Sequence, residues 1–344
     1  MDDSAPRYSR QILFSGIGQE GQTRIGASTV GLVGLGALGS SLAEMMVRSG
    51  VGRLIAVDRD VVEISNLHRQ GLYTDADAQE RLPKAVAAGR RLAAMNPEVQ
   101  VDAQVKDLDA GCAEEIFGDC DLILDGTDGF ETRYLINDLA IRLGIPWIYG
   151  ACVAATGMTA TVIPGTLPCL ACLFPDPPPP GTGASCDSVG IIPPAAALVA
   201  AIQASEALKI LAGHADLVRP SLLSIEMWPW RTVEIGGKNP RPRPGCTACD
   251  QKLGTFLGGT ARGRAESLCG RDAVQVRPRA SLGCTLAELA LRLESHGPVR
   301  VTEHLLSCRL DGYEVTVFAD GRALVKGTDE AAVARSLYSR YIGA

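Results

Sequence analysis

The chain has 344 residues, of which 46% are hydrophobic and 21% charged, with a net charge of −6 and a pI near 5.4. A chain of this length and composition buries a real core and has room for one large domain and an appendage. Its acidic balance and lack of a basic run exclude a nucleic-acid surface, because phosphate neutralisation needs clustered Lys and Arg. We therefore expect no nucleic-acid partner.

No segment indicates export or a membrane partner. The N-terminal MDDSAPRYSR is acidic and has no apolar core, so it does not resemble a secretory signal. The longest weakly polar window, residues 191–211, is interrupted by prolines and polar residues. We therefore predict a cytoplasmic protein whose eleven cysteines serve metal binding, catalysis or packing rather than disulfides.

Strand and helix patterns alternate after a helical N-terminal arm at residues 1–28. Short apolar runs predict strands, and spaced apolar residues predict helices. The predicted order is strand 29–33, helix 38–50, strand 53–58, strand 99–105, helix 110–118, strand 120–128, helix 131–144 and strand 146–152. Such alternation implies a mostly parallel sheet covered on both faces, so we predict an α/β, Rossmann-like, doubly wound fold.

The second half of the chain predicts a smaller piece. Residues 160–190 are rich in loop formers, 195–212 indicate an alanine-rich helix, and 236–245 indicate a Pro/Gly-rich connector. The tail is predicted to contain helix 285–297, strands 299–303, 305–310, 313–320 and 322–327, and helix 329–342. The predicted domains are the arm at 1–28, a main domain at 29–250 and a small α+β appendage at 251–344.

A glycine-rich turn, GLGALG at residues 34–39, follows the first strand and opens the first long helix. Glycine lets the backbone approach phosphates, and a helix N-terminus offers free N–H groups and a positive dipole end. Asp58, at the end of the next strand, is placed to bind ribose hydroxyls. The turn predicts a nucleotide site and by itself leaves NAD, FAD, S-adenosylmethionine and ATP open.

Charged residues further along the chain favour a triphosphate. The segment ISNLHRQ, which contains Arg69, is followed by Lys84. These two cations have no purpose in a hydride-transfer site, but they suit the charge that develops on a leaving pyrophosphate. Asp125 and Asp128 come at the end of another strand, where open α/β sheets bind ligands and where a magnesium carboxylate fits.

Nine motifs occur in one order along the chain: SRQ, GLGALG, VDRD, SNLHRQ, LPKA, TDGFETR, CLAC, SCDSVGIIPP and CTAC. Together they resemble the ThiF/MoeB family from about residue 7 to 250. The members of this family are adenylyltransferases that activate ubiquitin-like sulphur-carrier proteins. The runs RYSRQILFSGIGQEGQ and PWIYGACVAATGMTATVIPGTLPCLACL are closer to the thiamine branch of the family than to the molybdopterin branch.

The resemblance implies that MgATP and the C-terminal glycine of a carrier ending in Gly-Gly react to give an acyl-adenylate and pyrophosphate. It implies a homodimer in which Arg10 reaches the ATP of the partner subunit, and Mg²⁺ held by Asp128. The implied nucleotide-binding set is Gly34, Gly36, Ala37, Gly39, Asp58, Asp60, Asn66, Arg69, Gln70, Lys84 and Asp128. The implied catalytic residues are Arg10, Arg69, Lys84, Asp128 and Cys186.

Two residues depart from the family pattern. Ala37 stands where many relatives have a third glycine, and alanine is tolerated there if its φ is negative. Gly129 stands where the family usually has Asn after the magnesium aspartate, so one side-chain amide is missing from the adenylate pocket. The reaction class is expected to be unaffected.

Two C-x-x-C pairs predict a structural zinc site. Cys169 and Cys172 form one pair, and Cys246 and Cys249 form the other. Each spacing lets two thiolates bind one metal from a turn, and four thiolates make a closed tetrahedral site. Since 73 residues separate Cys172 from Cys246, the metal would join distant segments. A redox motif and buried free thiols are the alternatives.

Cys186 has no C-x-x-C partner and lies in a loop-forming stretch, GASCDSVG. The resemblance implies that it forms a thioester or acyl-disulfide with the carrier and has no role in adenylation. An incidental loop thiol is the alternative.

Four functional alternatives stay open at this point. One is the same reaction on a MoaD-like carrier, and another is adenylation of a peptide in natural-product biosynthesis. The others are a NAD- or FAD-linked oxidoreductase and a carrier-binding scaffold without catalysis. A sulphur donor protein is a possible further partner.

Overall fold

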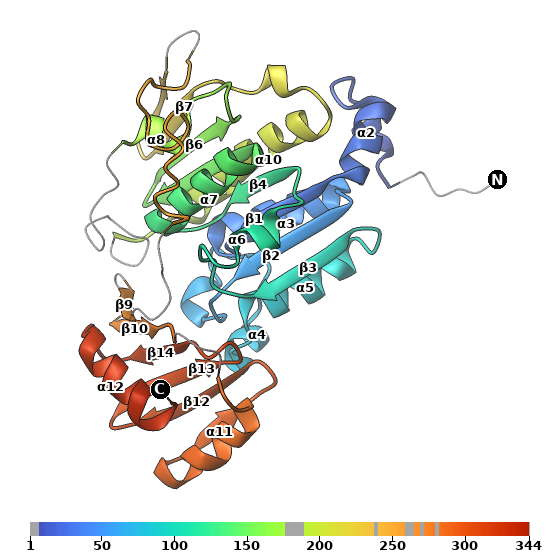
Figure 1. Ribbon diagram of the computed structural model, residues 1–344. Coiled ribbons are helices and arrows are strands. Elements are labelled where there is room, and N and C mark those ends of the chain that lie inside the picture. Colours follow the sequence, from blue (N-terminus) through green and yellow to red (C-terminus); the bar gives the residue numbers. More distant parts are fainter. Residues whose placement is uncertain are drawn as a thin grey trace, which may run out of the picture. The chain divides into compact units, whose positions relative to one another are not determined.

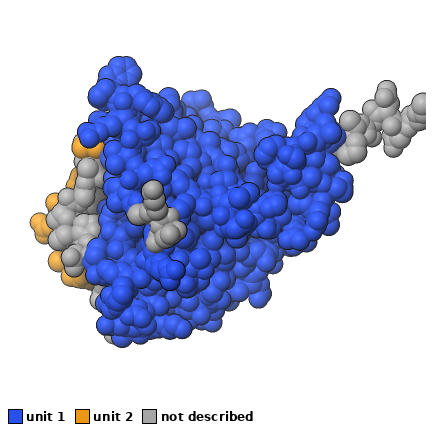
Figure 2. Space-filling view, turned by 90° about the horizontal axis from the view of Figure 1, so that it is seen from above, with its two compact units in different colours: residues 1–177, 191–259 blue, residues 178–190, 260–344 orange. Residues whose placement is uncertain are grey.

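The computed structural model describes residues 7–175, 189–236, 240–258, 265–268 (backbone only), 272–278 and 282–343. The chain divides into two compact units, coloured separately in Figure 2. Unit 1 takes residues 1–177 and 191–259, and unit 2 takes 178–190 and 260–344. The hydrophobic core of unit 2 shares no residue with those of unit 1.

Unit 1 is built on a sheet with the strand order β3-β2-β1-β4-β5-β6-β7-β8 in the described residues (Figure 1). Its strands are β1 Thr29–Val33, β2 Arg53–Asp58, β3 Gln100–Val105, β4 Leu122–Asp125, β5 Trp147–Val153, β6 Thr156–Val162, β7 Leu222–Met227 and β8 Trp230–Ile235. The strands from β3 to β5 pair in parallel, and β6, β7 and β8 extend the sheet in antiparallel fashion. The predicted Rossmann-like, mostly parallel sheet is thus confirmed, whereas β6, β7 and β8 were not predicted.

Helices cover both faces of this sheet. The helices of unit 1 in the described residues are α1 Ser9–Ile12, α2 Gly18–Ala27, α3 Ala37–Ser49, α4 Asp75–Glu80, α5 Lys84–Met95, α6 Ala113–Phe117, α7 Phe130–Leu143, α8 Leu170–Leu173 and α10 Pro193–Leu211, with the 3-10 turns η1 Ile64–Asn66 and η2 Ala215–Leu217. Buried residues of α3, α5 and α10 form one core, and those of α6, α7 and α8 form a second core on the other face. The sheet is therefore doubly wound, as predicted.

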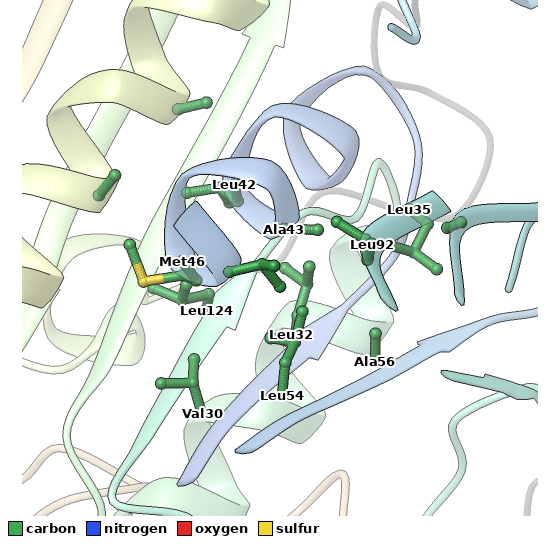
Figure 3. Packing of buried hydrophobic residues seen from close by; sticks show 14 of the residues in the cluster. Val30, Leu32, Leu35, Leu42, Ala43, Met46, Leu54, Ala56, Leu92 and Leu124 are labelled. Carbon is green, nitrogen blue, oxygen red and sulfur yellow. The ribbon is translucent and has the colours of Figure 1, made fainter. Parts of the chain in front are cut away.

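The first core centres on α3, the helix that the glycine turn opens. Leu42, Ala43 and Met46 lie on one face of this helix, at the spacing that a core-facing helix requires, and are fully buried. Figure 3 shows them packed against strand side chains such as Leu32 and Leu54. This packing fixes the start of α3 against the ends of the strands.

Helix α10, with 19 residues, is long and apolar enough to span a membrane by length and composition alone. It packs on α3, β5 and β6, and half of its most apolar window is buried inside the molecule. A core helix passes the same test, so the feature is weak evidence of a membrane span. The predicted helix at 195–212 is the same element.

The arm packs at the far end of α3 from the glycine turn. The Gln11 side chain donates to Oε1 of Gln22 (2.7 Å) and to the Ser49 carbonyl (2.9 Å). The Tyr8 hydroxyl accepts from the Asn96 side chain (2.8 Å). The Gln11 contacts attach α1 to α2 and to the last turn of α3, and the Tyr8 contact attaches the arm to the end of α5.

Unit 2 is a two-layer structure with an antiparallel sheet in the order β11-β12-β13-β14-β10-β9 in the described residues. Its elements are β9 Ala265–Leu268, β10 Ala273–Val276, α11 Leu286–Leu293, η3 Glu294–His296, β11 Val299–Val301, β12 Leu305–Leu310, β13 Tyr313–Phe318, β14 Ala323–Lys326 and α12 Ala331–Tyr341. Residues of α11 and α12 share one core with the central strands. The tail helices and the last four strands match the predicted elements, while β9 and β10 lie where no strand was predicted.

Candidate active site

The glycine turn is shaped by close contact between backbone segments. Gly34 has a φ of +88°, a conformation that favours glycine, and its N–H donates to the Val57 carbonyl (2.8 Å). A Cβ on Gly39 would lie 1.9 Å from the Gly34 carbonyl oxygen, so only glycine lets α3 start this close to β1. A Cβ on Gly36 would meet only Nε2 of Gln70, at 3.9 Å. Gly36 thus keeps space at the helix N-terminus, where phosphates bind.

Asp58 and Tyr73 hold Leu35, the residue inside the turn, from both sides. The Leu35 N–H donates to Oδ2 of Asp58 (2.6 Å), and the Leu35 carbonyl accepts from the Tyr73 hydroxyl (2.7 Å). Oδ1 of Asp58 also accepts from the Asp60 N–H (2.7 Å). Burial raises the pKa of Asp58, and Lys84 counteracts part of that increase. Asp58 therefore supports the turn in addition to its predicted role at the ribose.

Lys84 is the first residue of α5, and only 3% of it is exposed. The Lys84 ammonium lies 3.2 Å from Oδ2 of Asp60, and the backbone N–H of Lys84 donates to the Asp60 carbonyl (2.9 Å). A buried ammonium needs a partner, and Asp60 supplies it. The pair brings two predicted site residues from separate elements to one place.

The segment after β2 supplies three further predicted residues. Asn66 and Gln70 are buried, with 4% and 3% exposed. Nε2 of Gln70 lies near Gly36, and its Oε1 has no hydrogen-bond partner among the described residues. The Arg69 guanidinium donates to the Ser65 carbonyl (2.8 Å) and makes no ion pair within the described part of the chain. These groups surround the start of α3 with polar atoms that a ligand can engage.

Asp128 lies in the loop between β4 and α7 and is exposed. It has no hydrogen bond or ion pair with any other described residue. Gly126, two residues earlier, packs on the glycine turn, because a Cβ there would lie 2.7 Å from the Gly34 oxygen. Burial alone would lower the pKa of Arg59, yet the acidic groups around it, Asp128 among them, raise it. A carboxylate suited to Mg²⁺ therefore lies on the loop beside the turn.

Asp125 was expected beside Asp128 as a possible magnesium carboxylate, and the structure gives it a different role. It is fully buried and accepts from the Thr127 N–H (2.9 Å), the Thr127 hydroxyl (2.9 Å) and Nε of Arg133 (3.1 Å). Nη2 of Arg133 donates to the Thr127 carbonyl (2.6 Å) and the Gly150 carbonyl (3.2 Å). Asp125 and Arg133 thus hold the loop that carries Asp128.

The two departures from the family pattern fit the local backbone. Ala37 is the first residue of α3 and is not among the residues with positive φ, so its side chain is accommodated. Gly129 precedes α7 with a φ of −93°, and a Cβ there would meet only the Thr132 hydroxyl, at 3.5 Å. Nothing in the described backbone requires glycine at this position.

One predicted catalytic residue stands apart from this group. Arg10 is exposed on α1, which packs at the Ser49 end of α3. Helix α3 runs for 13 residues, or about 18 Å, from the glycine turn to that end. Arg10 is therefore out of reach of the glycine turn of its own chain. Cys186 lies outside the described residues.

The four cysteines of the C-x-x-C pairs form one cluster, which we call the four-cysteine cluster. Their Sγ atoms all lie within 4.8 Å of one another, with 3.7 Å from Cys169 to Cys172, 3.6 Å from Cys169 to Cys246 and 3.4 Å from Cys172 to Cys249. Four sulphurs around zinc at about 2.3 Å would be about 3.8 Å apart. Cys169 and Cys246 are fully buried in the second core. The cluster fits a closed structural zinc site.

We refer to the residues at the carboxyl ends of β1, β2 and β4, with the glycine turn, as the strand-end site. Within this site, Gly34 packs against Gly39 and Gly126, and Gly36 lies near Gln70. Asp58 bonds to the backbone of Leu35 and Asp60, and Asp60 pairs with Lys84. The sequence reasoning missed Tyr73 and Arg133. Arg133 ends the motif TDGFETR, which was the only local signal, and Tyr73 had none.

The sequence profile of the ThiF family matches residues 8–248 of the chain. The chain belongs to the ThiF family. Among its family relatives, a protein of Bacillus subtilis (strain 168) named sulfur carrier protein ThiS adenylyltransferase is 43% identical over 338 residues, covering 98% of this chain and 99% of that protein. A Thermus thermophilus protein named sulfur carrier protein adenylyltransferase is 45% identical over 212 residues, covering 60% of this chain and 78% of its own length.

Solved structures bear on the fold of this family member. The structure of E. coli MccB with ATP has a TM-score of 0.61 at 20% identity, and the match covers 72% of this chain and 75% of that chain. At this level of identity the likeness supports the fold alone.

Proposed function

We propose that the protein adenylates the C-terminal glycine of a ThiS-like sulphur carrier. The glycine carboxylate oxygen attacks the α-phosphorus of ATP, the bond from that phosphorus to the pyrophosphate oxygen breaks, and an acyl-adenylate and pyrophosphate form. No general base is needed, because the carboxylate is already ionised at neutral pH. The work of the chain is to position the reactants and to stabilise charge on the phosphates.

One observation carries the proposal: the relative named sulfur carrier protein ThiS adenylyltransferase matches 98% of this chain at 43% identity. The strand-end site agrees with it in chemistry. It combines a helix N-terminus with space at Gly36, the buried amide of Gln70, whose oxygen has no partner among the described residues, and an exposed carboxylate at Asp128. A hydride-transfer site does not need this combination of groups.

The roles follow from position. Backbone N–H groups at Gly36 and Ala37 face the phosphates. Each carboxylate oxygen of Asp58 accepts one backbone N–H, from Leu35 or Asp60, and its remaining lone pairs accept hydrogen bonds from the ribose hydroxyls. Further groups are assigned to hold the nucleotide and stabilise the transition state: Gly34, Gly39, Asp60, Asn66, Arg69, Gln70 and Lys84. Asp128 would hold Mg²⁺, which supplies charge neutralisation at the phosphates.

The partner subunit completes the site in this proposal. Arg10 is too far from its own glycine turn, so in a homodimer it serves the ATP of the other subunit. Cys186 acts after adenylation, with the carrier or a sulphur donor protein, and the reaction takes place in the cytoplasm. A MoaD-like carrier is less well supported, because the relative that matches nearly the whole chain is named for ThiS.

ATP–pyrophosphate exchange in the presence of a ThiS-like carrier ending in Gly-Gly tests the proposal. We expect exchange that depends on the carrier and that falls about 10²- to 10³-fold in Arg69→Ala and in Asp128→Ala. Arg90→Ala and Asp119→Ala, which remove exposed charges elsewhere, should retain it, as should Cys186→Ala.

Two outcomes would overturn the proposal. One is exchange that survives both site variants unchanged. The other is a protein that binds no MgATP and saturates with NADH, which would restore the oxidoreductase alternative. Carrier binding without any exchange would instead favour a scaffold.

A further inference from the structure

Two tryptophans stand exposed on the hairpin between β7 and β8. Met227 pairs with Trp230, so Trp228 and Pro229 form the two-residue loop of this hairpin. Trp228 is 81% exposed and Trp230 is 68% exposed, whereas Trp147, the third tryptophan of the chain, is fully buried. Tryptophan is rarely left in water without a reason, and it is enriched where proteins bind one another.

The apolar surface continues along β8. All six residues of this strand are exposed, including Val233 at 41% and Ile235 at 52%. β8 is the last strand of the sheet in the described residues, so one side of its backbone has no strand partner there. We call the Trp228–Trp230 loop and β8 the tryptophan hairpin.

Strand directions place the hairpin loop at the same edge of the sheet as the strand-end site. β4 and β5 are parallel, and β5 to β6 and β6 to β7 are each antiparallel, so β7 runs in the direction of β4. The carboxyl end of β7 at Met227 therefore lies at the edge where β4 ends at Asp125. The Met227 N–H donates to the Ala155 carbonyl (2.9 Å), in the turn that follows β5.

Strand spacing sets the distance between the two features. Neighbouring strands lie about 4.8 Å apart, so β7 is about 14 Å and β8 about 19 Å from β4. The strand registers place Asp125 level with Leu222, so the hairpin loop also lies about 17 to 20 Å further along the strand direction. The two features are therefore about 25 Å apart, and since an extended chain covers about 3.4 Å per residue, seven or eight residues span that gap. A protein that delivers its terminal glycine to the strand-end site through such a segment would have its folded part beside the tryptophan hairpin.

We propose that Trp228 and Trp230 bind the folded body of the carrier whose C-terminal glycine enters the strand-end site. This inference rests on the proposed function and adds where the carrier is held. The body must lie outside the site, because only an extended terminus can bring its carboxylate to the N-terminus of α3. Within the described residues, the hairpin carries the two most exposed aromatic side chains, Trp228 at 81% and Trp230 at 68%, compared with 40% for Phe130 at the same edge.

The double variant Trp228→Ala/Trp230→Ala tests the assignment in carrier-dependent ATP–pyrophosphate exchange. We expect the KM for the carrier to rise about tenfold or more, as for central aromatic contacts of an interface. The KM for ATP and the kcat at saturating carrier should stay within about twofold of wild type, because the hairpin touches no reacting group. Leu217→Ala is the matched control: Leu217 is 59% exposed and precedes the opposite end of β7.

A peptide with the last residues of the carrier separates the docking of the body from the chemistry. The peptide lacks the folded body, so the wild type and the double variant should have the same KM for it. That KM should be well above the KM of the wild type for the intact carrier. Tryptophan emission gives a second measurement, because Trp228 and Trp230 are exposed. Adding carrier to wild type without ATP should shift this emission to shorter wavelength, and Trp147, already buried, should add no shift.

The outcomes distinguish this inference from the proposed function. If wild type shows no carrier-dependent exchange, the proposed function fails. If wild type is active and the double variant keeps its KM for the carrier, the inference fails. It also fails if sedimentation shows that the double variant changes its oligomeric state, because the hairpin would then join copies of this chain.

Discussion

The four-cysteine cluster and the strand-end site are both polar groups gathered in unit 1, and they use their atoms in opposite ways. The cluster is closed: the four sulphurs face one another within 4.8 Å, and two of the cysteines are fully buried. The strand-end site leaves atoms unengaged, since Oε1 of Gln70 and the Asp128 carboxylate have no partner among the described residues.

This difference separates structure from chemistry within one fold. A closed set of ligands stabilises the chain and offers nothing to a substrate, because every ligand faces the metal. A site for ATP must keep hydrogen-bonding capacity until the ligand arrives, and such unsatisfied groups lower the stability of the empty protein. The surrounding residues, Asp125, Arg133, Tyr73 and Lys84, offset this by fixing the backbone on all sides. Each prediction below tests which of the two kinds of role a residue has.

The largest expected effect is on the cluster. Cys246→Ser should release the metal and lower the free energy of unfolding by about 5 kcal/mol or more, because it also frees the two chain segments that the metal joins. Metal analysis and urea unfolding measure this, while ATP affinity of the folded protein should be unchanged. Cys112→Ser, outside the cluster, should keep its zinc. A zinc-replete Cys246→Ser would show that this thiol is not a ligand.

Next comes the buried ion pair behind the strand-end site. Arg133→Met leaves the Asp125 carboxylate buried without its cation, so stability should fall by about 3 to 5 kcal/mol. Arg142→Met, in the same helix, breaks an exposed pair with Glu114 and should cost less than about 1 kcal/mol. Equal losses in the two variants would contradict the role given to Arg133.

Two glycines of one turn should respond differently. Gly39→Ala places a Cβ against the Gly34 oxygen and should destabilise by about 1 to 3 kcal/mol. Gly36→Ala meets only Gln70 Nε2, so the protein should fold normally but bind ATP more weakly, because the methyl group occupies space assigned to phosphate. Thermal unfolding and calorimetric titration with MgATP measure the pair. Normal ATP affinity in Gly36→Ala would show that the phosphates do not bind beside Gly36.

The smallest effect is a pH dependence. Burial raises the pKa of Asp58 above its ordinary 3.8, so the folded state holds this proton more tightly than the unfolded chain. The contribution of Asp58 to the stability of the ligand-free protein should therefore be greatest below pH 3.8. It should fall as the pH rises from 3.8 to the pKa of Asp58 in the folded state, by at most about 1.4 kcal/mol per pH unit. Urea unfolding between pH 4 and 7 should give a smaller slope for Asp58→Asn. Asp119→Asn, at an exposed position, should leave the slope unchanged.

The parts of the fold that periodicity predicted are those with a strong local pattern. Buried runs such as TVGLV and RLIAVD became β1 and β2, and the apolar spacing of α3 matched its buried face. The strands β6, β7 and β8 were not predicted because they depart from the alternation of strand and helix: β6 follows β5 directly, and β8 follows β7 directly. β8 in particular is exposed along its whole length, and its alternation is confined to the four residues TVEI, from which no strand was predicted.

What the sequence by itself determined are the residues whose chemistry is local: the glycines of a turn, the thiol pairs at metal spacing, and the cations and carboxylates in family order. Such motifs carry their own conformational and ligand preferences, so they can be recognised without the fold. Only the tertiary structure decided which of two nearby aspartates is buried with Arg133 and which is exposed, and that Tyr73 holds the turn. It also decided that the two cysteine pairs meet and that Trp228 and Trp230 stay in solvent. These outcomes depend on distant segments packed together, and contacts between residues far apart in the chain leave no local pattern to read.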